Sequence, residues 1–257
     1  AIASALTVMF LYWTITHLAW RLLRYRMNNS VSSDEDSISL KDKIIILGSG
    51  LVGALAYTFT DTFWFSAVEG EVYATSSLFT AVVFWAVLKW ENEADSQYAN
   101  RWLILISFLM GLSIGVHLLN LLAIPAIVLV YYFRKNEVSA HGIIKALLVS
   151  LIILGLMMYV IIPGVVWLAS RFELIFVNGF GLPYNSGVIF YLILLFGGLA
   201  FGLWKTWKQK KIVMNTALLM VTVIIIGYST YSMIIFRSMA NPPMDENNPD
   251  NIFSLQY

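Results

Sequence analysis

Residues 102–133 read WLILISFLMGLSIGVHLLNLLAIPAIVLVYYF, and this stretch of 32 residues contains no acidic residue, lysine or arginine. As a single α-helix it would be about 48 Å long, whereas the hydrocarbon core of a bilayer is about 30 Å thick. The alternative is two short or tilted segments, 102–116 and 118–133, that meet near His117. The choice between these two arrangements decides the orientation of every later segment.

The composition of the whole chain is that of a membrane protein. Of its 257 residues, 59% are hydrophobic and only 12% are charged. A soluble domain has about a quarter of its residues charged, so lipid must cover most of this surface. A net charge of +1 argues against a nucleic-acid partner, and the absence of cysteine excludes disulfides and thiolate metal sites. We therefore expect an all-α fold, a polytopic bundle of transmembrane helices.

Six further segments are apolar and close to the roughly 20 residues that cross a bilayer. They are 1–20, 44–67, 72–88, 146–169, 188–204 and 212–236. Cytoplasmic loops are enriched in lysine and arginine. If 102–133 crosses twice, 14 of the 16 basic residues lie on the cytoplasmic side, and only Arg171 and Arg237 lie outside. If it crosses once, 9 basic residues lie on one side of the membrane and 7 on the other.

The charge distribution thus favours two crossings and about eight membrane segments, with both ends of the chain extracytoplasmic. Residues 1–236 form the predicted transmembrane domain, and residues 237–257 begin an extracytoplasmic segment. The polar loop 27–43 is predicted to be a flexible cytoplasmic connection. Because the chain opens on an apolar residue other than methionine and stops in mid-pattern, we expect it to be part of a longer polypeptide.

Small residues four apart allow helices to approach closely in lipid. The pairs Gly111/Gly115 and Gly198/Gly202 have this spacing and are predicted to pack helices together.

Two carboxylates flank a glycine in the short turn between 44–67 and 72–88. In an extended turn Glu69 and Glu71 project to the same side, and Gly70 favours such a turn. The pair could hold a divalent cation, or one member could accept a proton from a hydroxyl group. The plainer interpretation is a polar cap on a helical hairpin, with Trp64 and Tyr73 as aromatic anchors at the interface.

Other polar residues lie in or beside apolar segments, where they are costly and hence functional candidates. Asp61 precedes the Glu69–Glu71 turn and either lines a cavity or bonds to backbone. His117 and Asn120 are three residues apart on one helical face. They could bind phosphate or relay a proton, or simply bond between helices. Pro125 is expected to kink the returning helix, and Arg171 to extend its charge to the interface.

Three segments carry a resemblance to a known family. Phe63–Glu91 (FWFSAVEGEVYATSSLFTAVVFWAVLKWE), Gly111–Ala126 (GLSIGVHLLNLLAIPA) and Arg237–Asn251 (RSMANPPMDENNPDN) are similar to signatures of a bacterial membrane family. That family is related to the animal transmembrane O-mannosyltransferase that modifies plexin-type receptor domains, within the GT-C glycosyltransferase superfamily. The resemblance spans most of the chain.

The resemblance implies an inverting transfer of a sugar, with mannose expected, from a polyprenyl-phosphate donor to serine or threonine of translocated proteins. It places the protein in the bacterial inner membrane, surrounded by lipid, with its active side extracytoplasmic. The family carries its base in a first loop similar to Asp-Ser-Gly-Glu-Phe, followed by His-Pro-Pro-Gly. Neither motif occurs here, and Ala1–Trp20 resembles the span that follows them.

By the same resemblance, the catalytic candidates are Glu69 and Glu71, acting on the acceptor or supporting a possible divalent cation. His117 and Arg237 are candidates for the donor phosphate, and Asn120 and Asp61 for other contacts with substrate. Two other classes of protein stay open. A non-catalytic membrane scaffold would use the polar turn as a docking surface, whereas a transporter would need charges within its spans and an internal repeat.

Overall fold

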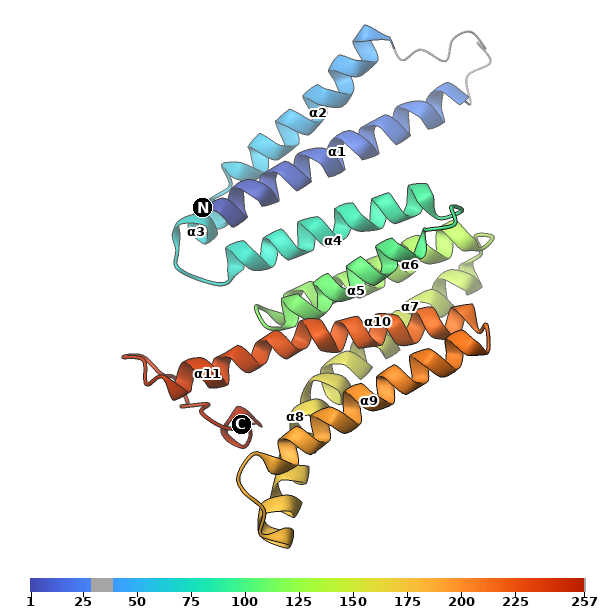
Figure 1. Ribbon diagram of the computed structural model, residues 1–257. Coiled ribbons are helices and arrows are strands. Elements are labelled where there is room, and N and C mark those ends of the chain that lie inside the picture. Colours follow the sequence, from blue (N-terminus) through green and yellow to red (C-terminus); the bar gives the residue numbers. More distant parts are fainter. Residues whose placement is uncertain (29–38, 257) are drawn as a thin grey trace. The chain divides into compact units, whose positions relative to one another are not determined.

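The structure is a computed structural model that describes residues 1–28 and 39–256 (Figure 1). Within these ranges the chain forms helices joined by short connections, and no residue is in a β-strand. The predicted all-α fold is therefore confirmed. Most of the polar loop 27–43 lies outside the described residues, but Ser39 caps the next helix by accepting a hydrogen bond from the backbone N–H of Asp42 at 3.1 Å.

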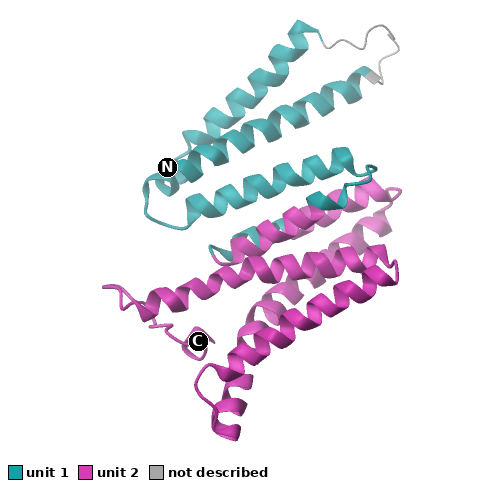
Figure 2. Ribbon diagram, viewed as in Figure 1, with its two compact units in different colours: residues 1–102, 116–123 teal, residues 103–115, 124–257 magenta. Residues whose placement is uncertain are grey.

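The chain divides into two units, residues 1–102 with 116–123 and residues 103–115 with 124–257 (Figure 2). In unit 1, α1 packs against α2 and α4, while the 3₁₀ helix η1 also packs against α4. Its elements are α1 (Ile2–Asn28), α2 (Leu40–Thr58), α3 (Asp61–Val68), α4 (Tyr73–Glu93) and η1 (Leu118–Ala123).

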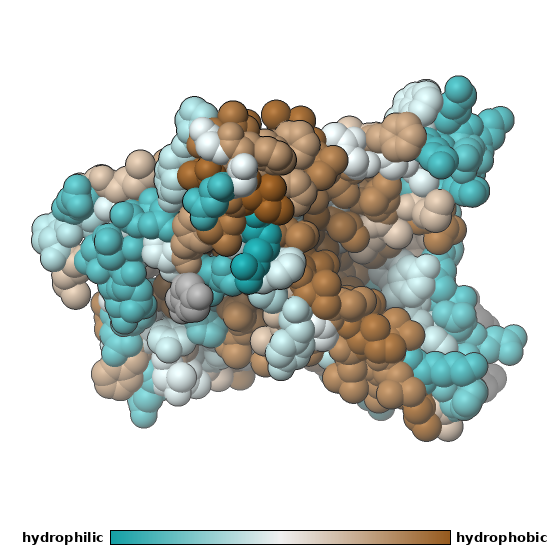
Figure 3. Space-filling model, turned by 90° about the horizontal axis from the view of Figure 1, so that it is seen from below, coloured by the Kyte–Doolittle hydropathy of each residue, from teal (hydrophilic) through white to brown (hydrophobic). Residues whose placement is uncertain are grey.

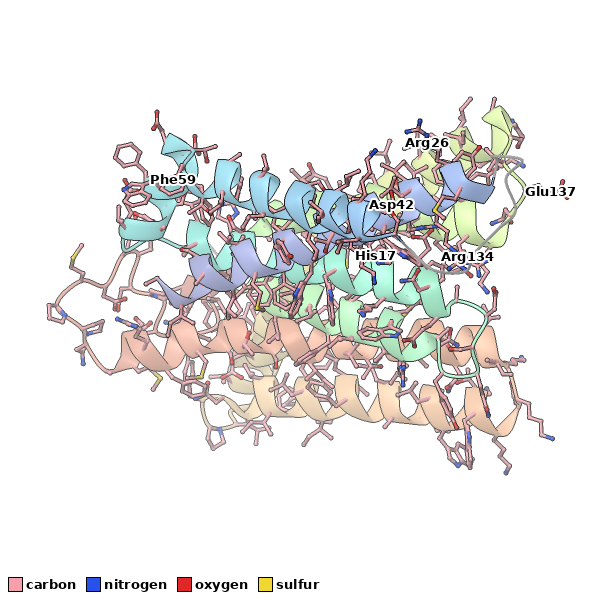
Figure 4. All side chains as sticks on the ribbon, turned by 90° about the horizontal axis from the view of Figure 1, so that it is seen from above. His17, Arg26, Asp42, Phe59, Arg134 and Glu137 are labelled. Atoms are coloured by element: carbon pink, nitrogen blue, oxygen red, sulfur yellow. The ribbon has the colours of Figure 1, made fainter. Side chains whose placement is uncertain are left out.

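The predicted span 44–67 is not one continuous helix. It is broken at residues 59–60, where α2 and α3 meet at 66°. Thr60 has extended backbone angles, and its hydroxyl donates to the carbonyl of Tyr57 at 2.8 Å. The rings of Phe59, labelled in Figure 4, and Trp64 stack across the bend with their centroids 6.4 Å apart. Aromatic packing and a side-chain hydrogen bond thus replace the helical continuation.

The stretch 102–133 forms two helices, so the alternative of one long helix is wrong. α5 (Asn100–Ile114) ends before His117, and α6 (Ile124–Lys135) follows η1. Within unit 2, α5 and α6 run in opposite directions (Figure 1). Pro125 lies in the first turn of α6, directly after η1, where the helix changes from 3₁₀ to α; the kink expected at Pro125 stays a prediction.

Unit 2 contains the remaining helices and a π-helical turn on each side of α8. They are α7 (Ala140–Leu156), η2 (Met157–Ile161), α8 (Ile162–Leu174), η3 (Ile175–Gly179), α9 (Ser186–Lys208), α10 (Ile212–Tyr228), η4 (Ser229–Ser232), α11 (Met233–Met239) and η5 (Ser254–Gln256). Pro163, the second residue of α8, has no backbone N–H, and the π turn η2 directly precedes α8. Such turns keep a helix continuous past a missing hydrogen bond.

Helical structure continues to Gly179, ten residues beyond the predicted span 146–169. The buried Glu173 explains the stability of this extension, since its carboxylate accepts the backbone N–H groups of Asn185 at 2.5 Å and Val188 at 3.0 Å. It thereby caps the N-terminal end of α9. The helices touch closely at Gly187, where an added Cβ would lie 2.5 Å from the backbone nitrogen of Glu173.

The C-terminal segment returns to α8. The hydroxyl of Ser170 donates to Gln256 at 2.9 Å, and Ser238 donates to the carboxylate of Asp245 at 2.6 Å. Burial raises the pKa of Tyr184 in the α8–α9 loop, and the carboxylates of Glu173 and Asp250 raise it further. The segment 237–257 therefore contacts the helices of unit 2.

The helices carry the apolar surface of an integral membrane protein. Five helical stretches are long and apolar enough to cross a bilayer, or six if the bent α2–α3 pair counts as one span. Each of the eight predicted segments lies largely on helix, but α4 is not among these stretches and α5 has only 15 residues, so the count of eight stays a prediction. Large hydrophobic side chains are exposed along α9, and much of the surface in Figure 3 is hydrophobic.

Basic residues collect at one end of each unit. In unit 1 they lie at the end of α1, the start of α2 and the end of α4; in unit 2 they lie where α6 and α9 end. Arg171 and Arg237 lie at the other end of unit 2, and the guanidinium of Arg171 covers the ring of Trp167 at 5.2 Å. Such stacking fits the interfacial role predicted for Arg171.

The close helix contacts predicted for Gly111 and Gly115 are present. A Cβ at Gly111 would lie 2.8 Å from the Cα of Ile224 on α10, and one at Gly115 would lie 3.3 Å from the hydroxyl of Thr230. Gly202 faces the side chain of Leu218, whereas Gly198 has no neighbour within 4 Å, so the prediction is wrong at Gly198.

We expect Gly111→Ala to destabilise the protein by about 1–3 kcal/mol, because the new methyl group would push the backbones of α5 and α10 apart. Gly198→Ala is the matched control, since its methyl group would enter open space. Thermal unfolding of the detergent-solubilised protein, followed by tryptophan fluorescence, measures the difference. Equal melting temperatures for the two variants would contradict the close packing of α5 on α10.

A second expectation concerns Glu93, whose carboxylate accepts the Trp102 indole N–H at 2.9 Å and the Arg101 guanidinium at 2.7 Å. The hydrogen bond from Trp102, followed by that from Arg101, lowers the pKa of Glu93. A group with a lowered folded pKa stabilises the protein above its unfolded pKa of about 4.3, and this stabilisation is lost as the pH falls through the folded value.

The melting temperature of the wild type should therefore fall more steeply below about pH 5 than that of Glu93→Gln, which lacks the titrating group. The control is Glu137→Gln, because the exposed Glu137 side chain makes no hydrogen bond within the described ranges. The idea fails if the Glu93 and Glu137 variants show the same acid profile.

Candidate functional site

A cavity of about 600 Å³ opens in unit 1 between α1, α3 and α4. Its walls are mainly apolar, with Phe63, Phe84 and Leu119 among them. Hydroxyl groups interrupt these walls; among them are those of Thr7, Thr14, Ser66, Ser76, Ser77 and Thr80. The cavity therefore combines space for an apolar chain with a set of small polar groups.

The hydroxyl groups lie together because of their spacing. Thr7 and Thr14 are seven residues apart on α1, and Ser76 and Thr80 are four apart on α4, so each pair shares a helix face. Thr7 donates to the carbonyl of Ala3 at 2.8 Å, and Thr80 donates to that of Ser76 at 3.2 Å. The hydroxyl of Ser76 is buried without a hydrogen-bond partner among the described residues. Sequence reasoning missed this set, although the spacing was visible.

The Glu69–Gly70–Glu71 turn lies directly between α3 and α4. Glu69 ends α3 with extended backbone angles, and its N–H donates to the carbonyl of Phe65 at 2.9 Å. Both carboxylates are exposed, and no atom lies within 4 Å of a Cβ built at Gly70. The turn that was predicted between two helices is present, and its carboxylates are free to meet a ligand.

His117 lies at the same end of unit 1 as this turn. Its ring packs against Tyr73, the first residue of α4, with the centroids 5.6 Å apart. The Nδ1 atom accepts the backbone N–H of Leu119 at 3.1 Å. In a neutral imidazole the proton is then on Nε2. Since Tyr73 and Leu119 both line the cavity, His117 can present an N–H donor beside its mouth.

The other three candidates differ in how exposed they are. Asn120 belongs to η1 and is only 1% exposed. Asp61 is exposed in the first turn of α3, where the helix dipole stabilises a negative charge. Arg237 is exposed in the last turn of α11 in unit 2. The structure thus brings His117 and the two glutamates to one end of unit 1.

No group of three or more histidine, aspartate and glutamate side chains in residues 1–28 and 39–256 is arranged to hold a metal ion. The possible divalent cation stays a prediction. A carboxylate pair alone would leave most positions of such a cation to water or to substrate oxygens.

The arrangement can perform three chemical tasks. Exposed carboxylates can accept a proton from a hydroxyl, an imidazole N–H can donate to an anionic oxygen, and a cavity with apolar walls can hold a hydrocarbon chain. All three features occur at the end of unit 1 where α3 meets α4.

Comparison with known proteins gave a family match for the N-terminal part of the chain. No curated protein and no solved structure matches the chain. Residues 1–140 match the family described as the Protein O-mannosyl-transferase TMEM260 N-terminal domain. This region contains α1 to α6, and with them the cavity, the two glutamates and His117. Because residues 1–140 are more than half of the 257 residues of the chain, the chain belongs to this family.

Proposed function

We propose that the protein is a GT-C type mannosyltransferase of the bacterial inner membrane. It transfers mannose from a polyprenyl-phosphate donor to serine or threonine side chains of translocated proteins. The observation that carries the proposal is the coincidence of the family match with a hydroxyl-bearing cavity beside two exposed glutamates. The reaction takes place on the extracytoplasmic side of the membrane.

The cavity binds the first isoprene units of the donor. Phe63, Phe84 and Leu119 offer apolar contact, and the volume of about 600 Å³ is in the range of small-molecule sites. A lipid-linked sugar keeps its phosphate at the headgroup level, where Trp64 and Tyr73 are exposed as aromatic anchors. The sugar then lies beside the Glu69–Glu71 turn.

In the transfer itself the acceptor oxygen forms a bond with C1 of mannose, while the bond between C1 and the phosphate oxygen breaks. A carboxylate of Glu69 or Glu71 takes the proton of the acceptor hydroxyl. The departing polyprenyl phosphate carries the electron pair of the broken bond, and the Nε2–H of His117 stabilises its charge. Attack from the face opposite the phosphate inverts the configuration at C1.

The remaining candidates have supporting roles. Arg237 adds positive charge for the phosphate, in a segment 237–257 that lies outside the membrane, and Asp61 contacts the acceptor or the sugar. Asn120, which is buried in η1 three residues after His117, stays a proposed contact with substrate. If the reaction requires a divalent cation, Glu69 and Glu71 would hold it, and it would supply positive charge to the departing phosphate.

We expect Glu69→Gln to lower sugar transfer by about 100-fold or more if Glu69 is the base, because positioned proton transfer contributes about 10²–10⁴-fold. Transfer of mannose to an acceptor peptide by the full-length protein measures this, with Glu71→Gln as the parallel variant. Glu137→Gln, which removes an exposed carboxylate between α6 and α7, is the control. Full activity in the Glu69, Glu71 and double variants would discard the assignment and favour a docking role for the turn.

The orientation is tested by labelling. These 257 residues contain no cysteine, and a Cβ at Gly70 meets no neighbour, so Gly70→Cys is structurally mild. An impermeant maleimide should label it in intact cells. Ser96→Cys, in the exposed turn after α4, should react only after the membrane is permeabilised. The reverse pattern would place the proposed site on the cytoplasmic side.

A further inference from the structure

A second cleft lies between α1 and α4, at the end of unit 1 away from the Glu69–Glu71 turn. Its volume is about 430 Å³. It is lined from α1 by Trp13, His17 and Trp20 and from α4 by Trp85, Lys89 and Asn92; His17 is labelled in Figure 4. The chemistry proposed for the glutamate turn uses none of these residues.

The charges around this cleft leave an excess of positive charge. Arg21 and Glu91 form an ion pair, so they largely neutralise each other. The guanidinium of Arg24 lies over the Trp20 ring at 5.2 Å, and the ammonium of Lys89 lies over the Trp85 ring at 5.5 Å. Neither forms an ion pair with a carboxylate in the part of the chain that the structure describes. An incoming anion therefore finds cations already placed beside the cleft.

Hydrogen-bond donors of the cleft suit an anion as well. The amide nitrogen of Asn92 lies 3.4 Å from the Nε2 atom of His17, which makes Nε2 the acceptor and Nδ1 the site of the proton in the neutral ring. Three nitrogen groups can then donate: the ammonium of Lys89, the amide of Asn92 and the imidazole of His17. Charge-assisted bonds from nitrogen donors are the strong contacts of phosphate oxygens.

The tryptophan side chains of the cleft indicate how deep it lies in the membrane. The ring centroids of Trp13 and Trp85 lie 6.2 Å apart, and the ring of Trp85 also packs edge-on against that of Trp102, with the centroids 5.7 Å apart. Tryptophan is enriched at the headgroup level of membranes. A group that enters this cleft is therefore a headgroup rather than an acyl chain.

We propose that this cleft is a binding site for a phosphate group, with Lys89, His17 and Asn92 as its donors and the tryptophans as its walls. The phosphate belongs to the headgroup of an anionic phospholipid in the leaflet predicted to be cytoplasmic. A soluble phosphate compound offers the same chemistry, and the experiment separates the two sources.

The test uses the full-length protein in phosphatidylcholine nanodiscs that contain a small fraction of phosphatidylglycerol. Native mass spectrometry counts the phosphatidylglycerol molecules that stay bound. Lys89→Gln should weaken this binding by about tenfold, the effect of one charge-assisted hydrogen bond. The control is Lys208→Gln on α9, because Lys208 covers the ring of Trp204 at 5.1 Å in the same manner but lies outside the cleft.

A second arm adds inorganic phosphate to lipid-depleted protein in detergent. If phosphatidylglycerol binding is weakened by Lys89→Gln and is not displaced by inorganic phosphate, the ligand is the lipid headgroup. If instead inorganic phosphate binds and this binding is weakened by Lys89→Gln, the ligand is a soluble phosphate compound. Asn92→Leu removes a donor without changing the charge and should weaken the same ligand, which covers the case of a poorly folded Lys89 variant. The proposal is overturned if neither ligand depends on Lys89 and Asn92, or if Lys208→Gln has an equal effect.

Discussion

Lipid offers no hydrogen-bond partner to the peptide backbone, and this constraint governs where the polar chemistry of the protein lies. A chain in hydrocarbon must satisfy its own N–H and C=O groups, which favours helices throughout. Three short connections of the described part of unit 1 lie at 59–60, 69–72 and 116–117. Thr60, Tyr73 and Leu119, which lie at or near these connections, line the larger cavity. The residues that can reach a substrate are thus those next to the places where the helices stop.

Polar groups within the helices obey the same constraint in a different way. The hydroxyl groups of Thr7 and Thr80 donate to backbone carbonyls one turn earlier in the same helix, so burying them in hydrocarbon costs little free energy. Glu173 is tolerated at 1% exposure because it binds the free N–H groups at the start of α9. These buried polar side chains thus bond to the backbone of a helix. The buried hydroxyl of Ser76 has no hydrogen-bond partner among the described residues, and Ser76 lines the larger cavity.

The parts of the fold that depend on segment length and charge could be predicted from the sequence. The break near His117 followed from a stretch too long for one bilayer and from the basic residues beyond it. The bend at 59–60 could not be predicted, because neither proline nor glycine marks it and ring packing between Phe59 and Trp64 holds it. The cap by Glu173 also escaped prediction, since it requires α9 to approach α8 at Gly187. In the candidate site, the glutamate turn was visible as a motif, whereas the cavity arises only when three helices meet.

The two recesses of unit 1 use different faces of the same two helices. An α-helix turns by about 100° per residue, so the stripe of Thr7 and Thr14 on α1 lies roughly 100° around the helix from the stripe of His17 and Trp20. The stripes on α4 are separated by a similar angle. One recess therefore has hydroxyl groups and faces α3, while the other has tryptophan and basic side chains and lies at the far end. Because no side chain lines both, a ligand can occupy one recess without displacing a ligand from the other.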